Sequence, residues 1–149
     1  MKTILVTLHI DDSQKQKLLN AAGGSADLLF LPSREVTDEL LAQTDAVIGN
    51  LPPKRLSGLV NLKWVQLGSA GVDGYTTPGV FPEGAVLTNA SGAYGLAISE
   101  HMIACLLFLM KNLCGYAENQ KEHLWRDCGP VSSVWNSQTL VVGLGDIGG

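Results

Sequence analysis

The residues best suited to chemistry lie at the end of the chain, where Gly143, Gly145 and Gly148 form a G-x-G-x-x-G pattern. The residues just before it, 139–142 (Thr-Leu-Val-Val), predict a short apolar strand. A strand that leads into this pattern is typical of the first turn of a dinucleotide-binding βαβ unit. Gly143 would permit the tight turn, Gly145 would let the backbone approach a pyrophosphate, and Gly148 would let the next helix pack closely on the strand.

The amides of Asp146 and Ile147 would face the phosphate oxygens at the start of that helix. The rest of the helix, and the acidic residue expected about 20 positions further on, would follow Gly149. We therefore expect this sequence to be the first part of a longer protein, cut within its nucleotide-binding unit. The alternative is a glycine-rich turn in some other α/β protein, since the chain contains 17 glycines.

A second candidate site is the segment 67–73 (Leu-Gly-Ser-Ala-Gly-Val-Asp), which follows a predicted strand at 63–67. Parallel sheets bind ligands at the carboxyl ends of their strands. Small residues here would let consecutive backbone N–H groups converge on an anion, such as a substrate carboxylate. Taken alone, an ordinary turn explains this segment equally well. A third stretch, 89–101, should run along a cleft between two domains.

The elements that would position these segments alternate along the first 90 residues. Helices are predicted from a cap at Asp12 or Ser13 to Ala22, from a cap at Thr37 through Gln43, and as a short piece over 54–60. The predicted strands are 2–8, 27–31, 45–48, 63–67 and 85–88. Apolar strands alternating with helices indicate a parallel sheet covered on both faces, and a flavodoxin-like α/β domain.

The pattern changes after Gly95. Residues 96–113 predict one long helix, apolar nearly all round from Met102 onward, which Gly115 would end. Such a helix should be buried on more than one side, between domains or between subunits. A more polar helix is expected over 116–125. The domain boundary is placed near 91–95, which gives a domain at 1–95 and an incomplete second domain at 96–149.

Composition limits the class of protein. The formal charge of −4 argues against nucleic acid or an anionic membrane as partner. The longest apolar run, 102–110, is far shorter than the roughly 20 residues that a membrane span requires. The N-terminus soon reaches Asp11 and Asp12, which predicts a first strand and not a signal peptide. We expect a soluble, cytoplasmic protein with reduced cysteines. No metal site is expected, because the spacing of Cys105, Cys114 and Cys128 does not fit a zinc site.

Taken together, the motifs resemble the D-isomer-specific 2-hydroxyacid dehydrogenase family, which includes phosphoglycerate, glyoxylate/hydroxypyruvate, D-lactate and formate dehydrogenases. The resemblance covers the whole chain. It rests on 68–73 (Gly-Ser-Ala-Gly-Val-Asp), 89–92 (Asn-Ala-Ser-Gly), 99–101 (Ser-Glu-His), Trp125 and 143–148 (Gly-Leu-Gly-Asp-Ile-Gly), in the family's order and approximate spacing. It implies a flavodoxin-like substrate domain followed by the start of a Rossmann NAD-binding domain.

The resemblance also implies roles for individual residues. The amides of Ala70 and Gly71 would hold the substrate carboxylate, and Tyr94 and Ile98 would lie near the substrate and the nicotinamide. The positions of Asp146 and Ile147 would touch the pyrophosphate. Two residues depart from the family: many relatives have Arg, His or Asn at Asp146, and Tyr94 replaces a smaller polar residue, so substrate preference does not carry over.

The implied activity is oxidoreduction at the CH–OH group of a small D-2-hydroxy acid, or reduction of the 2-oxo acid, with NAD or NADP. Relatives dimerise through their nucleotide domains, with the long helix involved. The family's catalytic Arg, Glu and His all follow the fingerprint. No catalytic residue is therefore expected within this chain, and residues 1–149 alone should be inactive. Structural or solvated roles are assigned to His9, His101 and His123.

The alternative function is that of a non-catalytic fragment, or a binding or interaction module that retains only the substrate half-site. An isolated 1–149 would leave the strand at 139–142 without neighbours and the apolar helix without a packing partner. The ribose-binding residue that separates NAD from NADP would lie beyond Gly149, so both cofactors stay open.

Overall fold

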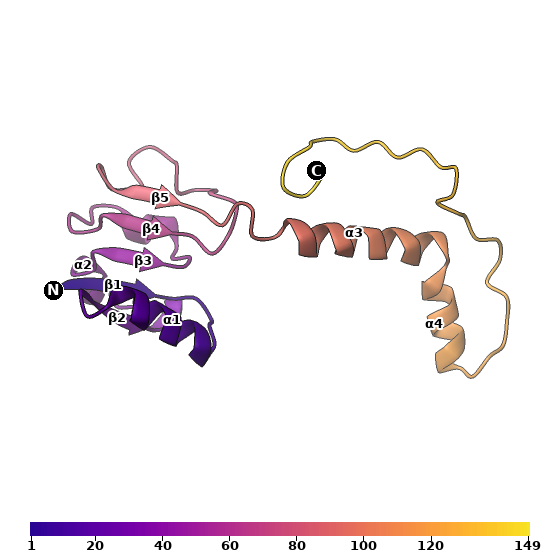
Figure 1. Cartoon of the computed structure of the whole chain (residues 1–149), viewed down its shortest axis with the longest axis horizontal. Coiled ribbons are helices and arrows are strands. Elements are labelled where there is room, and N and C mark those ends of the chain that lie inside the picture. Colours follow the sequence, from indigo (N-terminus) through magenta and orange to yellow (C-terminus); the bar gives the residue numbers. More distant parts are fainter. The chain divides into compact units, whose positions relative to one another are not determined.

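The computed structural model describes every residue from Met1 to Gly149. The chain divides into two compact units, Met1–Ser91 and Gly92–Gly149. The first contains the whole β-sheet, and the second contains two helices followed by an extended segment (Figure 1). The two units therefore differ in kind: one has a hydrophobic core around a sheet, and the other does not.

The sheet of the first unit has five strands in the order β2-β1-β3-β4-β5, and every neighbouring pair is parallel (Figure 1). This is the strand order of flavodoxin-like doubly wound folds. The α/β, flavodoxin-like prediction is thus confirmed. The strands are β1 (Lys2–Val6), β2 (Ala26–Phe30), β3 (Ala46–Ile48), β4 (Trp64–Gln66) and β5 (Val86–Thr88), each close to its predicted place and mostly shorter.

The core is built on one row of side chains that crosses the sheet. Leu5 of β1 lies opposite Val47 of β3, and Val47 lies opposite Val65 of β4. All three are buried, with Leu29 and Leu87 continuing the row at the two edges. Branched apolar side chains suit a sheet buried on both faces, and their removal from water is the main stabilising contribution to this unit.

The helix α1 (Asp12–Ala22) packs against β2 and begins one residue earlier than the predicted caps imply. The cap is Asp11, not Asp12 or Ser13. The Asp11 carboxylate accepts from Gln14 N at 2.8 Å, and Gln14 Oε1 accepts from Asp11 N at 2.9 Å. This reciprocal capping box explains the difference. Gly23, with φ +54°, ends the helix as predicted.

The second helix, α2 (Asp38–Ala42), also confirms its predicted cap. Thr37 Oγ1 accepts from Leu40 N at 3.2 Å. Two 3₁₀ turns complete the unit, η1 (Ser33–Glu35) and η2 (Pro53–Leu56). The prediction of a helical piece over 54–60 was too long, because the chain leaves the turn after Leu56 and Gly58 takes a positive φ of 77°.

The second unit contains α3 (Gly95–Met110) and α4 (Leu113–Lys121), whose axes meet at 70°. The prediction that Gly115 ends the long helix was wrong. The break falls at Asn112, which takes a φ of +50°, a conformation that asparagine tolerates well. Gly115 lies inside α4, where an added Cβ would come within 3.1 Å of Asn112 Oδ1 and 3.2 Å of Cys128 Sγ. Glycine is needed there for close packing.

The predicted helix over 116–125 was also wrong at both ends. α4 begins at Leu113 and ends at Lys121, because His123 takes a φ of +54° and turns the chain. Trp125 lies beyond the helix and is fully exposed. The predicted strand at 139–142 is not formed, and Leu140 and Val142 are exposed. A strand needs a neighbour to accept and donate its backbone hydrogen bonds, and no segment of this chain pairs with it.

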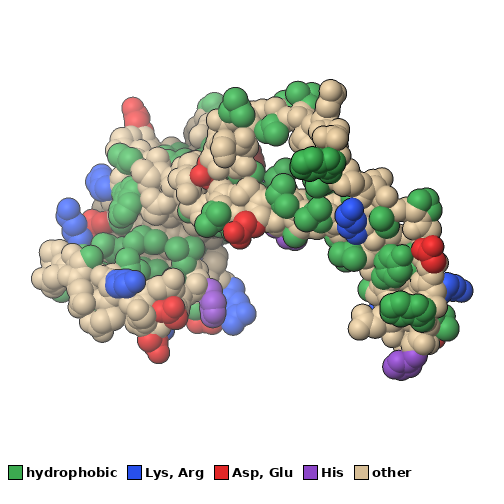
Figure 2. All heavy atoms as spheres, turned by 45° about the vertical axis from the view of Figure 1, so that its right-hand side comes forward, with side chains coloured by type: hydrophobic (Ala, Val, Ile, Leu, Met, Phe, Trp, Pro, Cys, Tyr) green, Lys and Arg blue, Asp and Glu red, His purple; other side chains and the backbone are tan.

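The apolar side chains of α3 are exposed in this chain, and only Gly95 is buried. Leu109 is 75% exposed, and Met102, Ile103 and Phe108 are also exposed; Figure 2 shows hydrophobic side chains gathered over the helices. The expected burial of this helix is therefore not met within residues 1–149, and its place between domains or subunits stays a prediction. No single helix is long and apolar enough to cross a membrane, although α3 and α4 together meet that test across their bend.

Candidate functional site

Three loops meet at the carboxyl edge of the sheet in the first unit. They follow β3, β4 and β5, which are neighbours in the sheet and run in the same direction. The loop after β4 is the predicted anion-binding segment 67–73. Both neighbouring loops bond to it through an asparagine, Asn50 from the β3 side and Asn89 from the β5 side. The segment is therefore held on two sides.

Three consecutive carbonyl groups of the β4 loop accept hydrogen bonds. Ser69 O accepts from Ala90 N at 2.9 Å, and Ala70 O accepts from Asn89 Nδ2 at 2.8 Å. Gly71 O accepts from the Ser69 hydroxyl at 2.9 Å. Three consecutive carbonyls are thus fixed, two of them by the loop that follows β5. This fixes the planes of the peptides that join Ser69, Ala70 and Gly71.

The N–H groups of Ala70 and Gly71 belong to the same peptides but, unlike the carbonyls, have no hydrogen-bond partner within the chain. A trans peptide places its N–H and C=O on opposite sides, so Ala70 N–H and Gly71 N–H point away from the acceptor side. Neither donates a hydrogen bond within the chain, and both residues are exposed. Two consecutive free amides on a fixed loop are the donor pattern of a backbone nest, a feature that can bind an anion. The Asp73 carboxylate lies close to Gly71 (3.6 Å from an added Cβ) and would oppose a second negative charge.

The loop after β3 is fixed by a buried tyrosine. The hydroxyl of Tyr75, a residue that is 6% exposed, donates to Leu51 O at 2.7 Å. Burial raises the pKa of Tyr75 above its ordinary value, and the nearby Asn50 side chain opposes this with a smaller effect. Pro53 also packs on Gly74, where an added Cβ would lie 3.2 Å from its Cγ. The β3 and β4 loops therefore form one braced layer.

The end of β1 completes this edge. Gly49 takes a φ of +130°, and an added Cβ would collide with the Thr7 hydroxyl, so glycine lets β1 and β3 end side by side. The Thr7 hydroxyl is buried and has no hydrogen-bond partner. His9 follows in the loop after β1 and is exposed. No hydrogen bond or ion pair links His9 to the β4 loop, and its structural role stays a prediction.

Tyr94 and Ile98 lie at the start of α3 in the second unit. Tyr94 is the residue before the helix, and Ile98 N donates to Tyr94 O at 3.0 Å in its first turn. Both side chains are exposed. Further along α3, the His101 ring lies 3.4 Å from Cys105 Sγ. The chain contains no group of three or more side chains that could hold a metal ion.

The glycine fingerprint forms a closed turn. Gly143 takes a φ of +101°, and a Cβ on Gly148 would collide with Gly143 O. Gly149 N donates to Gly145 O at 3.0 Å, which begins one turn of helix. The space around an added Cβ at Gly145 is open to at least 4 Å. The turn is closed without the strand that was predicted to precede it.

Phosphate oxygens would meet the free amides of this turn. The N–H groups of Asp146 and Ile147 donate no hydrogen bond within the chain. The Asp146 carboxylate is turned toward the start of α3, where an added Cβ on Gly95 would lie 2.5 Å from Asp146 Oδ1. A carboxylate is favourable at a helix N-terminus. Both amides are therefore available to an acceptor outside the chain.

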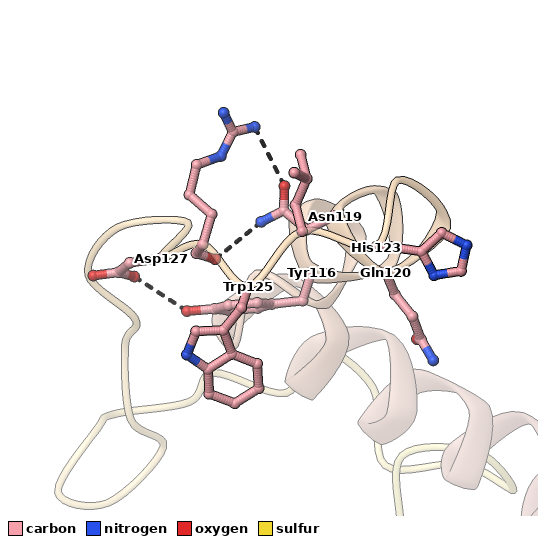
Figure 3. Close-up of a pocket in the computed structure, with 8 residues that line it drawn as sticks. Tyr116, Asn119, Gln120, His123, Trp125 and Asp127 are labelled. Atoms are coloured by element: carbon pink, nitrogen blue, oxygen red, sulfur yellow. Dashed lines mark hydrogen bonds between the residues drawn. The ribbon is translucent and has the colours of Figure 1, made fainter.

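A cavity of about 740 Å³ lies in the second unit, between α4 and the loop that follows it (Figure 3). Its polar groups bond to one another: the Tyr116 hydroxyl donates to Asp127 at 3.2 Å, and Asn119 bonds to Arg126 in both directions. None of the residues predicted to bind substrate or cofactor lines it. The cavity is therefore separate from both predicted sites.

The fold defines a class: a flavodoxin-like α/β unit with a five-stranded parallel sheet, followed along the chain by two helices and a glycine-rich turn. Solved structures of similar fold exist. A D-isomer specific 2-hydroxyacid dehydrogenase family protein from Aeromonas salmonicida is 29% identical over 88% of this chain, with a TM-score of 0.68. Phosphoglycerate dehydrogenase from Lactobacillus plantarum is 28% identical over 98% of it, with a TM-score of 0.51.

A third structure, D-lactate dehydrogenase from Aquifex aeolicus complexed with NAD and lactic acid, is 16% identical over 89% of the chain, with a TM-score of 0.69. At that identity the likeness is one of fold. Neither a protein-family model nor a curated protein sequence matches the chain. The chain spans less than half of each similar structure, namely 42%, 47% and 40%. The resemblance to D-isomer-specific 2-hydroxyacid dehydrogenases is confirmed for that part of their length.

Sequence reasoning missed the two asparagines that hold the β4 loop. Asn89 lies within a motif to which no role was given, and Asn50 received no predicted role. The position of each asparagine was the available signal. Asn89 directly follows the predicted strand at 85–88, and Asn50 follows the predicted strand at 45–48 with one residue between. In a parallel sheet such positions lie on the same edge as the ligand.

Proposed function

We propose that this chain forms the substrate domain and the beginning of the cofactor domain of an NAD- or NADP-dependent oxidoreductase. Its substrate would be a small D-2-hydroxy acid, oxidised at the CH–OH group, or the corresponding 2-oxo acid, reduced. The observation that carries the proposal is the pair of free amides at Ala70 and Gly71, on a loop in which the carbonyls of Ser69, Ala70 and Gly71 all accept hydrogen bonds. The likeness to dehydrogenases of 28–29% identity supports the same conclusion.

In this proposal the amides of Ala70 and Gly71 bind the substrate carboxylate by charge-assisted hydrogen bonds. The amides of Asp146 and Ile147 bind the cofactor pyrophosphate, which can approach closely at Gly145. Tyr94 and Ile98 border the substrate and the nicotinamide. A bound nicotinamide supplies the hydride acceptor or donor. The group that moves the proton is not among these residues, so residues 1–149 alone would bind and not catalyse.

The proposed domains are 1–95 for the substrate and 96–149 for the start of the nucleotide-binding domain. Residues 139–142 would then become the first strand of a second sheet, which explains why an apolar β-rich segment is extended and unpaired here. A homodimer through α3 is part of the proposal, because that helix exposes Met102, Ile103 and Leu109. A cytoplasmic location is proposed with it, since the three cysteines are unpaired thiols.

A non-catalytic binding module is the second candidate. The observation in its favour is that the anion-accepting loop is complete within Met1–Ser91, whereas the cofactor turn has no sheet behind it. The two candidates differ in the mass of the native protein. A two-domain enzyme should have a mass about twice 15.8 kDa and reduce 2-oxo acids with NADH. A native protein of 15.8 kDa without that activity would support the module.

The direct test of the substrate site is a titration of the ¹⁵N-labelled chain with oxamate, a stable analogue of a 2-oxo acid. We expect saturable shifts at the amides of Ala70 and Gly71, with chloride at equal ionic strength as the control. Gly71→Pro removes one of the two donors and should weaken binding by roughly tenfold or more. In the intact enzyme the same variant should raise KM by a similar factor. Unchanged amide shifts in the unaltered chain would rule out this carboxylate site.

A further inference from the structure

The side chain of Asn50 bridges two points of the β4 loop. Its Oδ1 accepts from Gly68 N at 2.9 Å, and its Nδ2 donates to Ser69 Oγ at 2.9 Å. Asn50 comes from the loop after β3, so these bonds cross between neighbouring strand ends. A carboxamide suits this position because it offers an acceptor and a donor on one planar group.

The bridge leads directly to the free amides. The Ser69 hydroxyl that receives the Asn50 bond donates in turn to Gly71 O at 2.9 Å. A continuous chain of hydrogen bonds therefore runs from the β3 loop to the carbonyl of Gly71. Asn50 itself touches neither Ala70 nor Gly71 through any hydrogen bond, so its influence on them passes through Ser69.

The surroundings hold Asn50 in this place. Gly68 has no Cβ, and an added one would lie 3.3 Å from Asn50 Oδ1 and 2.6 Å from Leu8 Cδ2. The next residue, Leu51, is buried and is held at its carbonyl by the Tyr75 hydroxyl. The backbone of the β3 loop is thus anchored, while the Asn50 side chain is exposed toward the site.

We propose that Asn50 is a positioning residue for the substrate carboxylate: it fixes the Gly68–Ser69 segment so that the amides of Ala70 and Gly71 stay aimed at one anion. This inference rests on the proposed function for the identity of the anion, but the effect of Asn50 on the loop does not. Asn50 occupies one side of the loop and Asn89 the other, and loss of either should leave the two amides diverging.

The test compares Asn50→Ala with Asn61→Ala. Asn61 is a matched control, since its Nδ2 donates to the carbonyl of Ala42 at 2.8 Å and it precedes β4, at the opposite edge of the sheet. In ligand-free ¹⁵N relaxation, Asn50→Ala should increase the motion of residues 68–71 while Asn61→Ala does not. In the oxamate titration, Asn50→Ala should weaken binding about tenfold, with both variants unfolding at similar temperatures.

A second variant separates positioning from charge. Asn50→Asp keeps an acceptor for Gly68 N but adds a negative charge beside the site, so its loss of oxamate affinity should shrink as salt is raised. The loss in Asn50→Ala should not depend on salt. A salt-dependent loss in Asn50→Ala would contradict positioning, as would an unchanged oxamate affinity with unchanged loop motion.

The two proposals fail in different ways. If the unaltered chain binds no oxamate, the proposed substrate site is wrong. The positioning role of Asn50 is then tested only by the motion of residues 68–71. Increased motion in Asn50→Ala would then support the positioning role for whatever the loop binds, and unchanged motion would overturn it. If the unaltered chain binds oxamate and Asn50→Ala binds it equally well, the substrate site stands and the role of Asn50 falls.

Discussion

Tyr75→Phe should destabilise the first unit by more than an ordinary surface hydrogen bond would. The hydroxyl donates to Leu51 O at 2.7 Å, and both residues are buried, at 6% and 2% exposure. Phenylalanine keeps the packing but leaves a buried carbonyl without its donor. The cost of such an unsatisfied group is about 1–3 kcal/mol. For a unit of this size, each kcal/mol lowers the melting temperature by about 4–8 °C.

Tryptophan fluorescence makes the assay specific to this unit. Trp64 is the one tryptophan of Met1–Ser91 and is partly buried, with its Nε1 bonded to Thr88 Oγ1 at 2.8 Å. Trp125 and Trp135 are exposed already, so the change on unfolding in urea comes mainly from Trp64. Ser57→Ala, which removes an exposed hydroxyl that donates to Gly79 O at 3.1 Å in the same unit, is the control and should cost clearly less. A loss below about 0.5 kcal/mol in Tyr75→Phe would refute the reasoning.

The unaltered chain and Tyr75→Phe should also differ in how their stability depends on pH. The folded-state pKa of Tyr75 is raised above its ordinary value of 10.0, mainly by burial. Between the unfolded and folded pKa values, the unfolded chain loses this proton and the folded chain keeps it, so stability falls as pH rises. The contribution is complete below the unfolded pKa and is lost upward through the folded pKa. The stability difference between the unaltered chain and Tyr75→Phe should therefore narrow above about pH 10; a constant difference up to pH 11 would contradict the raised pKa.

Two further predictions concern the backbone turn and a surface bond. Gly148→Ala should open the fingerprint turn, because its Cβ would collide with Gly143 O, whereas Gly145→Ala should preserve it. The temperature coefficient of the Gly149 amide, which donates to Gly145 O, measures this, and equal coefficients in both variants would refute it. Arg55→Ala should cost about 1 kcal/mol in urea unfolding, because Arg55 Nη2 donates to Val36 O at 2.8 Å. Asp38→Ala, which removes the carboxylate partner of Arg55, should cost only a few tenths of a kcal/mol, because the Asp38 side chain is 86% exposed. Equal losses in the two variants would assign the stability to the Arg55–Asp38 ion pair.

The sheet and its loops could be predicted because their sequence signals are local. Each strand carries apolar residues, and parallel strands place their following loops on one edge. This was enough to place 67–73 at the carboxyl edge of the sheet. The role of Asn50 could not be derived in the same way, because its bonds reach residues 18 and 19 positions away. Such contacts depend on the register of β3 against β4.

The helices of the second unit were predicted less well for a related reason. Glycine commonly ends a helix, so Gly115 was the expected end. The break falls at Asn112 instead, whose Nδ2 donates to Cys128 O at 2.8 Å, a contact between residues 16 positions apart. The strand at 139–142 failed differently: its composition favours a strand, but composition cannot supply the neighbour with which a strand must pair.

The bonds from Ala90 N to Ser69 O and from Asn89 Nδ2 to Ala70 O also link the shape of the β4 loop to the opening of the sheet edge. β5 has only three residues and one neighbour, β4, and Ala90 and Asn89 directly follow it. Short edge strands open by local unfolding at a lower free energy than the centre of a sheet. Each such opening would release Ser69 O and Ala70 O together, so the amide of Ala90 should exchange with solvent at the rate at which the anion-binding loop loses its shape. An anion bound at that loop would, in turn, slow exchange along β5, at amides that it never touches.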